Sequence, residues 1–271
     1  MVLSKIIALG TGIYHHYGID AALRGLSKTG CGHVEIAASP GIDHVYPEMD
    51  DAAVQALAKK LKLHNLKAIS LNGNIGMMTD DGVEQSKKLI SLAPKLGAAI
   101  IVNTVGGEHL EEDLPPFLAN IGEVADHARS NGVTIGLEVH GKHTANGRLA
   151  LDTVCQVNDP NVKINYDTAN CIYFGDTWPY EDLDVAVPEI VHIHLKDKIG
   201  SKGLWNFPPI GSGEVDFERV LNILDNGGYG GALGVEIEFD DRGWPPLPEV
   251  DEAAMSAYRN LVKLLQPHWQ S

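Results

Sequence analysis

The 271-residue sequence has few cysteines and no long hydrophobic run. Its three cysteines, Cys31, Cys155 and Cys171, lie far apart and form neither a CxxC pair nor a disulfide framework, which favours a reducing compartment. No apolar stretch approaches the ~18 residues of a membrane-spanning helix. The first apolar run is interrupted by Lys5 and is too short for the core of a signal peptide. We therefore expect a soluble, cytoplasmic protein without a membrane partner.

Basic residues are also scarce, with 21 lysines and arginines against 36 aspartates and glutamates. The formal net charge of −15 argues against nucleic acid as a partner, because phosphate backbones attract basic surfaces. A composition that is 44% hydrophobic and 21% charged is typical of a globular chain. A chain of this length buries a large core, so neither disulfides nor a metal are needed for folding.

The sequence lacks a GxGxxG turn after its first predicted strand and lacks a Walker loop, which argues against a nucleotide-binding fold. Short β-branched runs instead alternate with segments whose apolar residues recur at helical spacing. Eight strands are predicted, over Lys5–Leu9, His33–Ile36, Lys67–Leu71, Ala98–Val102, Thr134–Val139, Lys163–Tyr166, Ile190–Leu195 and Leu233–Ile237. The clearest helices are predicted over Ala52–Leu63, Gly82–Leu92, Phe117–Ser130 and Phe217–Leu224, and a last helix is predicted over roughly Asp251–Leu265. This alternation predicts one α/β domain over residues 1–271, a single (β/α)8 TIM barrel.

Four consecutive predicted strands end in residues that could bind a cation. In this architecture the functional site lies at the C-terminal ends of the strands. The fifth to eighth strands bring to these ends Glu138 and His140, Asp167, His192 and His194, and Glu236 and Glu238. A charged side chain in an apolar strand is costly unless it is paired or bound to a metal. We therefore predict one divalent metal site in preference to four unrelated ion pairs.

The strand pattern leaves the exact ligands open. Side chains two residues apart share one face of a strand, so spacing does not separate His192 from His194, and the pairs at 138/140 and 236/238 are equally ambiguous. A set of carboxylates with one imidazole suits Mn²⁺, with Mg²⁺ and Co²⁺ as alternatives, because structural zinc prefers thiolates.

Several motifs resemble those of the xylose isomerase-like TIM barrel superfamily, often labelled sugar phosphate isomerase/epimerase. They are His192-Ile-His-Leu-Lys-Asp197, Gly228-Tyr-Gly-Gly-Ala-Leu-Gly-Val-Glu236, Asp167-Thr-Ala-Asn170 and Gly211-Ser-Gly-Glu-Val-Asp-Phe217. The superfamily includes ketose 3-epimerases, inosose isomerases and dehydratases, and endonuclease IV. The resemblance implies the barrel fold and a metal bound by four residues: Glu138, Asp167, His194 and Glu236.

The resemblance further implies an isomerase or epimerase of a small-molecule keto-sugar or keto-cyclitol. In related epimerases the two outer ligands, here Glu138 and Glu236, remove and return a proton beside a carbonyl through a metal-stabilised enediolate. His140, two residues past a ligand, is a further catalytic candidate. The predicted substrate contacts are Glu35, Asn170, His192, Lys196 and Trp205.

The main alternative is a metal-dependent lyase acting on a keto-sugar or inosose. The Leu195-Lys-Asp197 sequence resembles inosose dehydratases, and the tryptophan-bearing loop over 198–212 resembles the catalytic subunit of C-glycoside deglycosidases. Lys196 and Lys198 also stand where ketose 3-epimerases typically carry an arginine. A nuclease like endonuclease IV is disfavoured by the charge, and a non-catalytic sugar-binding barrel is a further alternative. The exact substrate, the native metal, and assembly as a homo-oligomer or with a partner subunit stay open.

Overall fold

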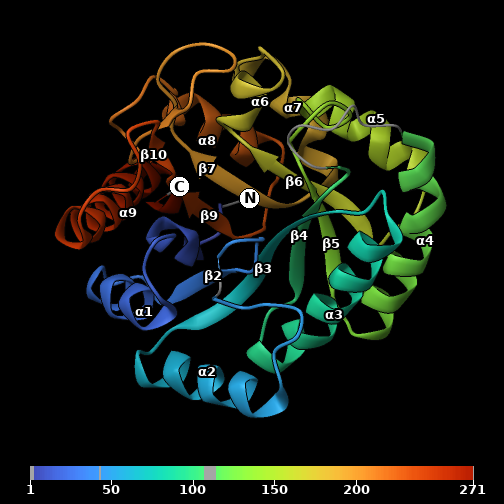
Figure 1. Cartoon of the computed structure of the whole chain (residues 1–271). Helices are drawn as coiled ribbons and strands as arrows, with labels where there is room; N and C mark the ends of the chain where they lie inside the picture. Colours follow the sequence, from blue (N-terminus) through green and yellow to red (C-terminus); the bar gives the residue numbers. More distant parts are fainter. Residues whose placement is uncertain (1–2, 43, 107–113, 271) are drawn as a thin grey trace.

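The computed structural model describes residues 3–42, 44–106 and 114–270. Its barrel strands are β1 (Ile7–Gly10), β2 (His33–Ala37), β3 (Lys67–Gly76), β4 (Ile100–Thr104), β5 (Thr134–Glu138), β6 (Val162–Asp167), β7 (Ile190–Lys196) and β9 (Leu233–Glu236). These parallel strands pair in chain order and close into a barrel, with β9 beside β1. In Figure 1 the helices lie outside the ring of strands. The predicted (β/α)8 barrel is confirmed.

Each barrel strand overlaps a predicted strand, but the ends differ. β1 begins at Ile7 and not at Lys5, because its pairing with β9 starts at Ile7, opposite Leu233. β3 continues five residues past its predicted end to Gly76, where it pairs with Thr104 of β4. Most strand residues are buried on both faces, since one face fills the barrel and the other packs against the helices.

The longer outer helices are α1 (Ile19–Lys28), α2 (Asp51–Leu63), α3 (Asp80–Leu96), α4 (Leu114–Ser130), α5 (Gly147–Val157), α8 (Phe217–Asn226) and α9 (Leu247–Gln270). Their ends follow local chemistry. The Thr79 side chain caps α3 by accepting from the Gly82 N–H, and Gly97 ends this helix with a left-handed φ of 89°. α9 is longer than the predicted Asp251–Leu265 at both ends. In the described parts of the chain, no helix is long and apolar enough to cross a membrane.

Two connections depart from the regular pattern. Between β6 and β7 the chain forms two four-residue helices, α6 (Asn170–Tyr173) and α7 (Leu183–Ala186), with 3-10 turns, where the other crossovers have one long helix. Above the C-terminal ends of the strands, β8 (Asn206–Phe207) and β10 (Phe239–Asp240) pair antiparallel. This small sheet ties the loop after β7 to the segment after β9.

The strand register brings the predicted ligands to the same end of the barrel. Asp167 at the end of β6 stands opposite His194 on β7, and Lys196 stands opposite Glu236 at the end of β9. Glu138 is the last residue of β5. All five side chains therefore belong to the C-terminal end of the barrel, where (β/α)8 enzymes carry their active sites.

Candidate metal centre and its cavity

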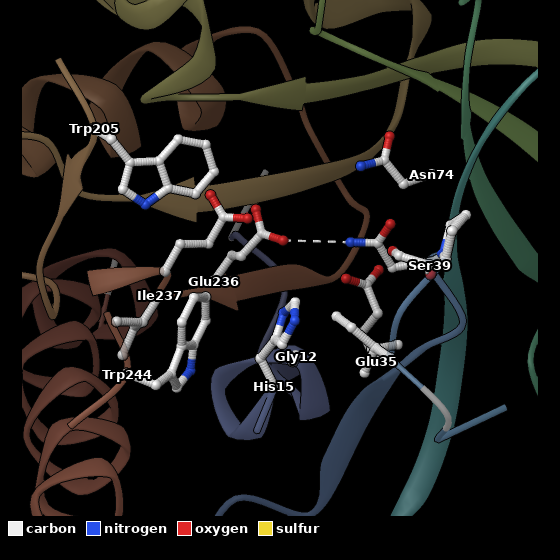
Figure 2. A pocket seen from close by; sticks show the side chains of 15 residues that line it. Gly12, His15, Glu35, Ser39, Asn74, Trp205, Glu236, Ile237 and Trp244 are labelled. Carbon is white, nitrogen blue, oxygen red and sulfur yellow. Dashed lines mark hydrogen bonds between the residues drawn. The ribbon is translucent and has the colours of Figure 1, made fainter. Parts of the chain in front are cut away.

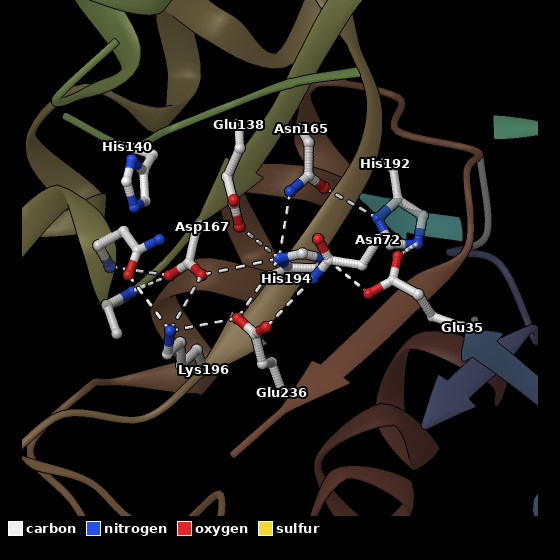
Figure 3. Close-up of polar contacts among 12 residues, drawn as sticks. Glu35, Asn72, Glu138, His140, Asn165, Asp167, His192, His194, Lys196 and Glu236 are labelled. Atoms are coloured by element: carbon white, nitrogen blue, oxygen red, sulfur yellow. Dashed lines mark hydrogen bonds and ion pairs between the residues drawn. The ribbon is translucent and has the colours of Figure 1, made fainter. Parts of the chain in front are cut away.

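Three carboxylates face one imidazole nitrogen (Figure 3). Nδ1 of His194 lies 2.9 Å from Oε1 of Glu138 and 3.7 Å from Oδ2 of Asp167. The same nitrogen lies 3.5 Å from Oε2 of Glu236. One ligand atom from each of these four residues lies within 4.8 Å of the others. The structure thus brings together the four side chains that the resemblance names as ligands.

The two oxygens of the Asp167 carboxylate have different surroundings, and this difference bears on whether the cluster fits a cation. Its Oδ1 accepts hydrogen bonds of 2.8 Å from the backbone N–H groups of Ala169 and Asn170. Its Oδ2 is buried, points into the cluster and has no hydrogen-bond donor among the described residues. A buried carboxylate oxygen without a hydrogen-bond donor is costly, and a cation bound closer than His194 and Lys196, which lie 3.7 and 3.9 Å away, would compensate for it. Together with an oxygen-rich donor set, this geometry fits a single divalent ion.

Two of the four proposed ligands, Glu236 and His194, have raised pKa values in the metal-free cluster. Burial raises the pKa of Glu236 to about 8, although Lys196 and His194 act in the opposite direction. Burial alone would lower the pKa of His194, but the carboxylates of Glu35 and Glu236 raise it well above its ordinary value. A metal therefore has to displace protons from this centre.

A cavity of about 420 Å³ opens beside the cluster (Figure 2). The side chains on its wall that carry charge or aromatic rings are those of His15, Glu35, Trp205, Glu236, Glu238 and Trp244. Its volume lies in the range of small-molecule sites, roughly 300–1,000 Å³. Glu236 is 15% exposed, against 3% or less for the other three cluster side chains, so it is the one most open to a ligand.

A second cavity of about 20 Å³ lies next to the first. Among the residues that border it are Glu138, His140, Asn170 and Lys196. Trp205, Glu236 and Glu238 border both cavities. The predicted catalytic residues and most predicted substrate contacts therefore surround one continuous site.

Lys196 supplies a buried positive charge to this site. Its Nζ lies 3.2 Å from Oε2 of Glu236 and 3.3 Å from Oδ1 of Asn170, and it also pairs with Glu238. Burial alone would lower the pKa of Lys196, but Glu236 and Glu238 raise it well above its ordinary value. The ring of Phe207 lies 4.4 Å from Nζ. Lys196 is therefore an ammonium that can donate hydrogen bonds but cannot act as a base.

His192, a predicted substrate contact, is placed differently. Its ring is fully buried inside the barrel and does not border either of the two cavities described above. Gly234 makes room for the ring, because a Cβ there would lie 2.8 Å from Cε1 of His192. Nδ1 of His192 lies 2.8 Å from Oδ1 of Asn165. Burial lowers the pKa of His192 to about 4, so its ring is neutral.

The sequence did not reveal several residues of this site. Asn72 on β3 donates to Oε1 of Glu236 at 3.3 Å, and Ser70 lies two residues earlier on the same strand. Polar residues at alternate positions in an otherwise apolar strand were the signal for these two. His15 and Trp244 come from segments between the predicted elements, where no periodicity marks them.

Two curated relatives share sequence with most of this chain. An inosose dehydratase from Clostridium botulinum (strain Alaska E43 / Type E3) is 28% identical over 224 residues, covering 69% of this chain and 74% of the relative. The L-ribulose-5-phosphate 3-epimerase UlaE from Salmonella typhi is 26% identical over 187 residues, covering 67% of this chain and 63% of the relative.

Solved structures share the barrel. The IOLI protein with a bound zinc atom superposes with a TM-score of 0.77 at 20% identity, over 97% of this chain and 99% of that one. A xylose isomerase-like TIM barrel protein from Mycobacterium smegmatis, in complex with magnesium, superposes with a TM-score of 0.73 at 15% identity, over 97% of each chain. Identities this low show the fold alone. Residues 23–261 match the family described as xylose isomerase-like TIM barrel, and the chain therefore belongs to this family, as its strand-end motifs predict.

Proposed function

We propose that this protein is a divalent-metal-dependent isomerase or epimerase of a keto-sugar or keto-cyclitol. The observation that carries the proposal is the convergence of Glu138 and Glu236 on one point from β5 and β9, beside a cavity of small-molecule size. Relatives named as an inosose dehydratase and a ribulose-phosphate epimerase support a substrate of the sugar or cyclitol class.

The ion would be held by Glu138, Asp167, His194 and Glu236. A divalent ion held there would supply Lewis acidity toward a substrate carbonyl. Zinc and magnesium in the two solved relatives support a divalent ion in this family. Mn²⁺ is our first choice, because three carboxylates and one imidazole suit a hard or borderline ion.

The two outer glutamates would move the proton. Both border the smaller cavity, so a substrate carbon placed there lies within reach of either carboxylate. One carboxylate removes a proton beside the carbonyl and a carboxylic acid returns it, which is general base and general acid catalysis. Lys196 and Asn170, also on this cavity, would donate hydrogen bonds to the substrate oxygen that gains negative charge.

Trp205 would bind the apolar face of the substrate ring. It borders both cavities, and its ring packs edge-on against Tyr173 and Phe207, with centroids 5.8 and 5.0 Å away. Phe207 is buried and belongs to the small sheet of β8 and β10. These contacts would hold Trp205 in place above the metal centre.

A lyase is the second candidate. The inosose dehydratase relative favours it, and so does the position of His140 on the smaller cavity. Elimination needs an acid close to the leaving group, and His140 would be that acid. The two reactions share the first proton removal; an isomerase then returns a proton to carbon, whereas a lyase expels the leaving group.

Turnover in D₂O separates the two candidates. Free keto-sugars, inososes and 3-keto-glycosides would be screened with Mn²⁺, with products followed by mass spectrometry and NMR. We expect a product that carries one deuterium on the carbon beside the carbonyl and has lost no fragment. A dehydrated or otherwise shortened main product would reject the isomerase and favour the lyase. In that case His140→Ala should stop elimination while solvent exchange at carbon continues.

A further inference from the structure

Glu35 reaches the metal centre from the far wall of the barrel. It lies on β2, and its side chain is 4% exposed. Its Oε1 lies 2.9 Å from Nε2 of His194, and its Oε2 accepts a hydrogen bond of 2.7 Å from the Ser70 hydroxyl. β2 and β7 are not neighbours in the barrel, so this contact crosses the barrel interior (Figure 3). Glu35 thus touches the back of a proposed ligand.

Two neighbours of His194 on the other side of its ring require opposite proton positions. Oε1 of Glu138, 2.9 Å from Nδ1, forms a hydrogen bond only if Nδ1 carries a proton. The amide nitrogen of Asn165, 3.1 Å from the same atom, donates only if Nδ1 is unprotonated. His192 keeps the Asn165 amide in this orientation, because its Nδ1 lies 2.8 Å from the amide oxygen. These contacts alone do not decide which tautomer a neutral His194 adopts.

An ion bound among the three other carboxylates needs the lone pair of Nδ1, so the proton of a neutral ring then has to lie on Nε2 and needs an acceptor there. Glu35 supplies that acceptor, because an ionised carboxylate can only accept hydrogen bonds. A neutral imidazole has one N–H, and with that proton on Nε2 the lone pair is on Nδ1, which faces the three other carboxylates. The Ser70 hydroxyl, which donates to Oε2, holds the Glu35 carboxylate in this position.

We propose that Glu35 is a positioning residue that keeps the His194 proton on Nε2 and so leaves Nδ1 available to a divalent ion. Hydrogen bonds of this kind orient metal-binding histidines and strengthen them as ligands. The inference rests on the proposed metal centre. It also assigns Glu35 a function different from the direct substrate contact that the sequence predicts.

Metal titration of the unloaded protein tests the proposal without any substrate. Glu35→Ala should weaken Mn²⁺ binding by roughly 10- to 100-fold, the usual effect of removing a partner of a ligating histidine. Glu35→Gln, which keeps an acceptor but loses the charge, should fall between Glu35→Ala and the native protein. Asp182→Asn is the matched control. Asp182 is a buried carboxylate outside the cluster, and it accepts hydrogen bonds from the Tyr166 hydroxyl and from the backbone N–H of Arg148. This variant should leave the Mn²⁺ affinity unchanged.

The position of the proton can be read directly in the zinc-loaded protein, which is diamagnetic. Nitrogen-15 NMR of labelled histidine should show the His194 proton on Nε2. A proton on Nδ1 would overturn the proposal. Ser70→Ala provides a second variant if Glu35→Ala does not fold, and it should weaken Mn²⁺ binding by roughly three- to tenfold, since the carboxylate stays but loses one anchor.

The remaining outcomes separate this inference from the proposed function. If the native protein binds no divalent ion, the metal centre itself is wrong. If it binds one ion and Glu35→Ala binds that ion equally well, the centre stands and the positioning function fails. Glu35, His192 and His194 also bring ligand atoms close together. Two ions per chain, one of them lost in Glu35→Ala, would make Glu35 a ligand of a second metal and would overturn the proposal.

Discussion

Lys196 and Glu236 are register partners on β7 and β9, and Nζ of Lys196 lies 3.2 Å from Oε2 of Glu236. A buried ammonium thus stands beside a proposed metal ligand. It repels a divalent ion, so it does not serve ion binding. Its position on the smaller cavity suits a donor to a substrate oxygen that becomes negative.

Replacing Lys196 should therefore affect turnover and not metal binding. We expect Lys196→Met to lower kcat by roughly 100- to 1,000-fold, the usual cost of removing one donor to a developing oxyanion. Mn²⁺ affinity, measured by titration calorimetry, should stay equal or increase. Lys163→Met is the control, because Lys163 pairs with Glu189 on the barrel outside the site. A loss of Mn²⁺ binding in Lys196→Met alone would show that Lys196 is needed to assemble the centre.

Glu236→Gln should abolish turnover and leave the fold intact. With a pKa raised to about 8 by burial, Glu236 is mostly protonated at pH 7 in the metal-free protein, and glutamine resembles that neutral form. We expect the melting temperature of the metal-free variant to stay within a few degrees of the native value, while kcat falls by roughly 100-fold or more. Melting many degrees lower would show that Glu236 is structural, and retained activity would remove it from proton transfer.

Metal binding should release protons. Below about pH 8 Glu236 holds a proton in the metal-free protein, and the neighbouring carboxylates raise the pKa of His194 well above its ordinary value. An ion needs the ionised carboxylate and an unprotonated Nδ1, so affinity should fall as pH falls, by roughly tenfold per unit for each proton displaced. Calorimetry in buffers of different ionisation enthalpy should show proton release at pH 7, and the number released should fall as the pH rises above about 8, where Glu236 is already ionised. Release of no protons at pH 7 would contradict these protonation states.

Removing the metal should lower stability as well as activity. An ion that binds only the folded chain stabilises it by about 2.7 kcal/mol at a free concentration 100 times its Kd. We expect EDTA to abolish turnover and to lower the melting temperature, and we expect added Mn²⁺ to restore both. Asp167→Asn should lose this thermal response, because it changes the oxygen that points into the cluster without a donor. A thermal response preserved in Asp167→Asn would place the ion elsewhere.

The barrel itself could be predicted from the sequence, because eight β-branched runs alternating with helical segments leave few other topologies. The small sheet of β8 and β10 could not, since two-residue strands have no measurable period. The β6–β7 connection was equally hidden, because helices of four residues such as α6 carry too little amphipathic pattern to be recognised.

The candidate site divides in the same way. The strands that supply the proposed ligands follow from the sequence alone, because Glu138, Asp167 and Glu236 all end apolar runs at the functional end of the barrel. The sequence does not show which histidine joins these carboxylates, since His192 and His194 share one face of β7. Two residues along a strand amount to roughly 6.5 Å of depth in the barrel.

Only the pairing of neighbouring strands sets that depth. The register of β7 with β6 puts His194 level with Asp167, and His192 lies one layer deeper, opposite Asn165. The sequence also could not predict the contact between Glu35 and His194, because 159 residues separate the two and only closure of the barrel brings β2 across from β7. The sequence by itself determined the fold and the chemical character of the site. The tertiary structure decided which side chains touch, because register and barrel closure depend on contacts between strands that are distant in the chain.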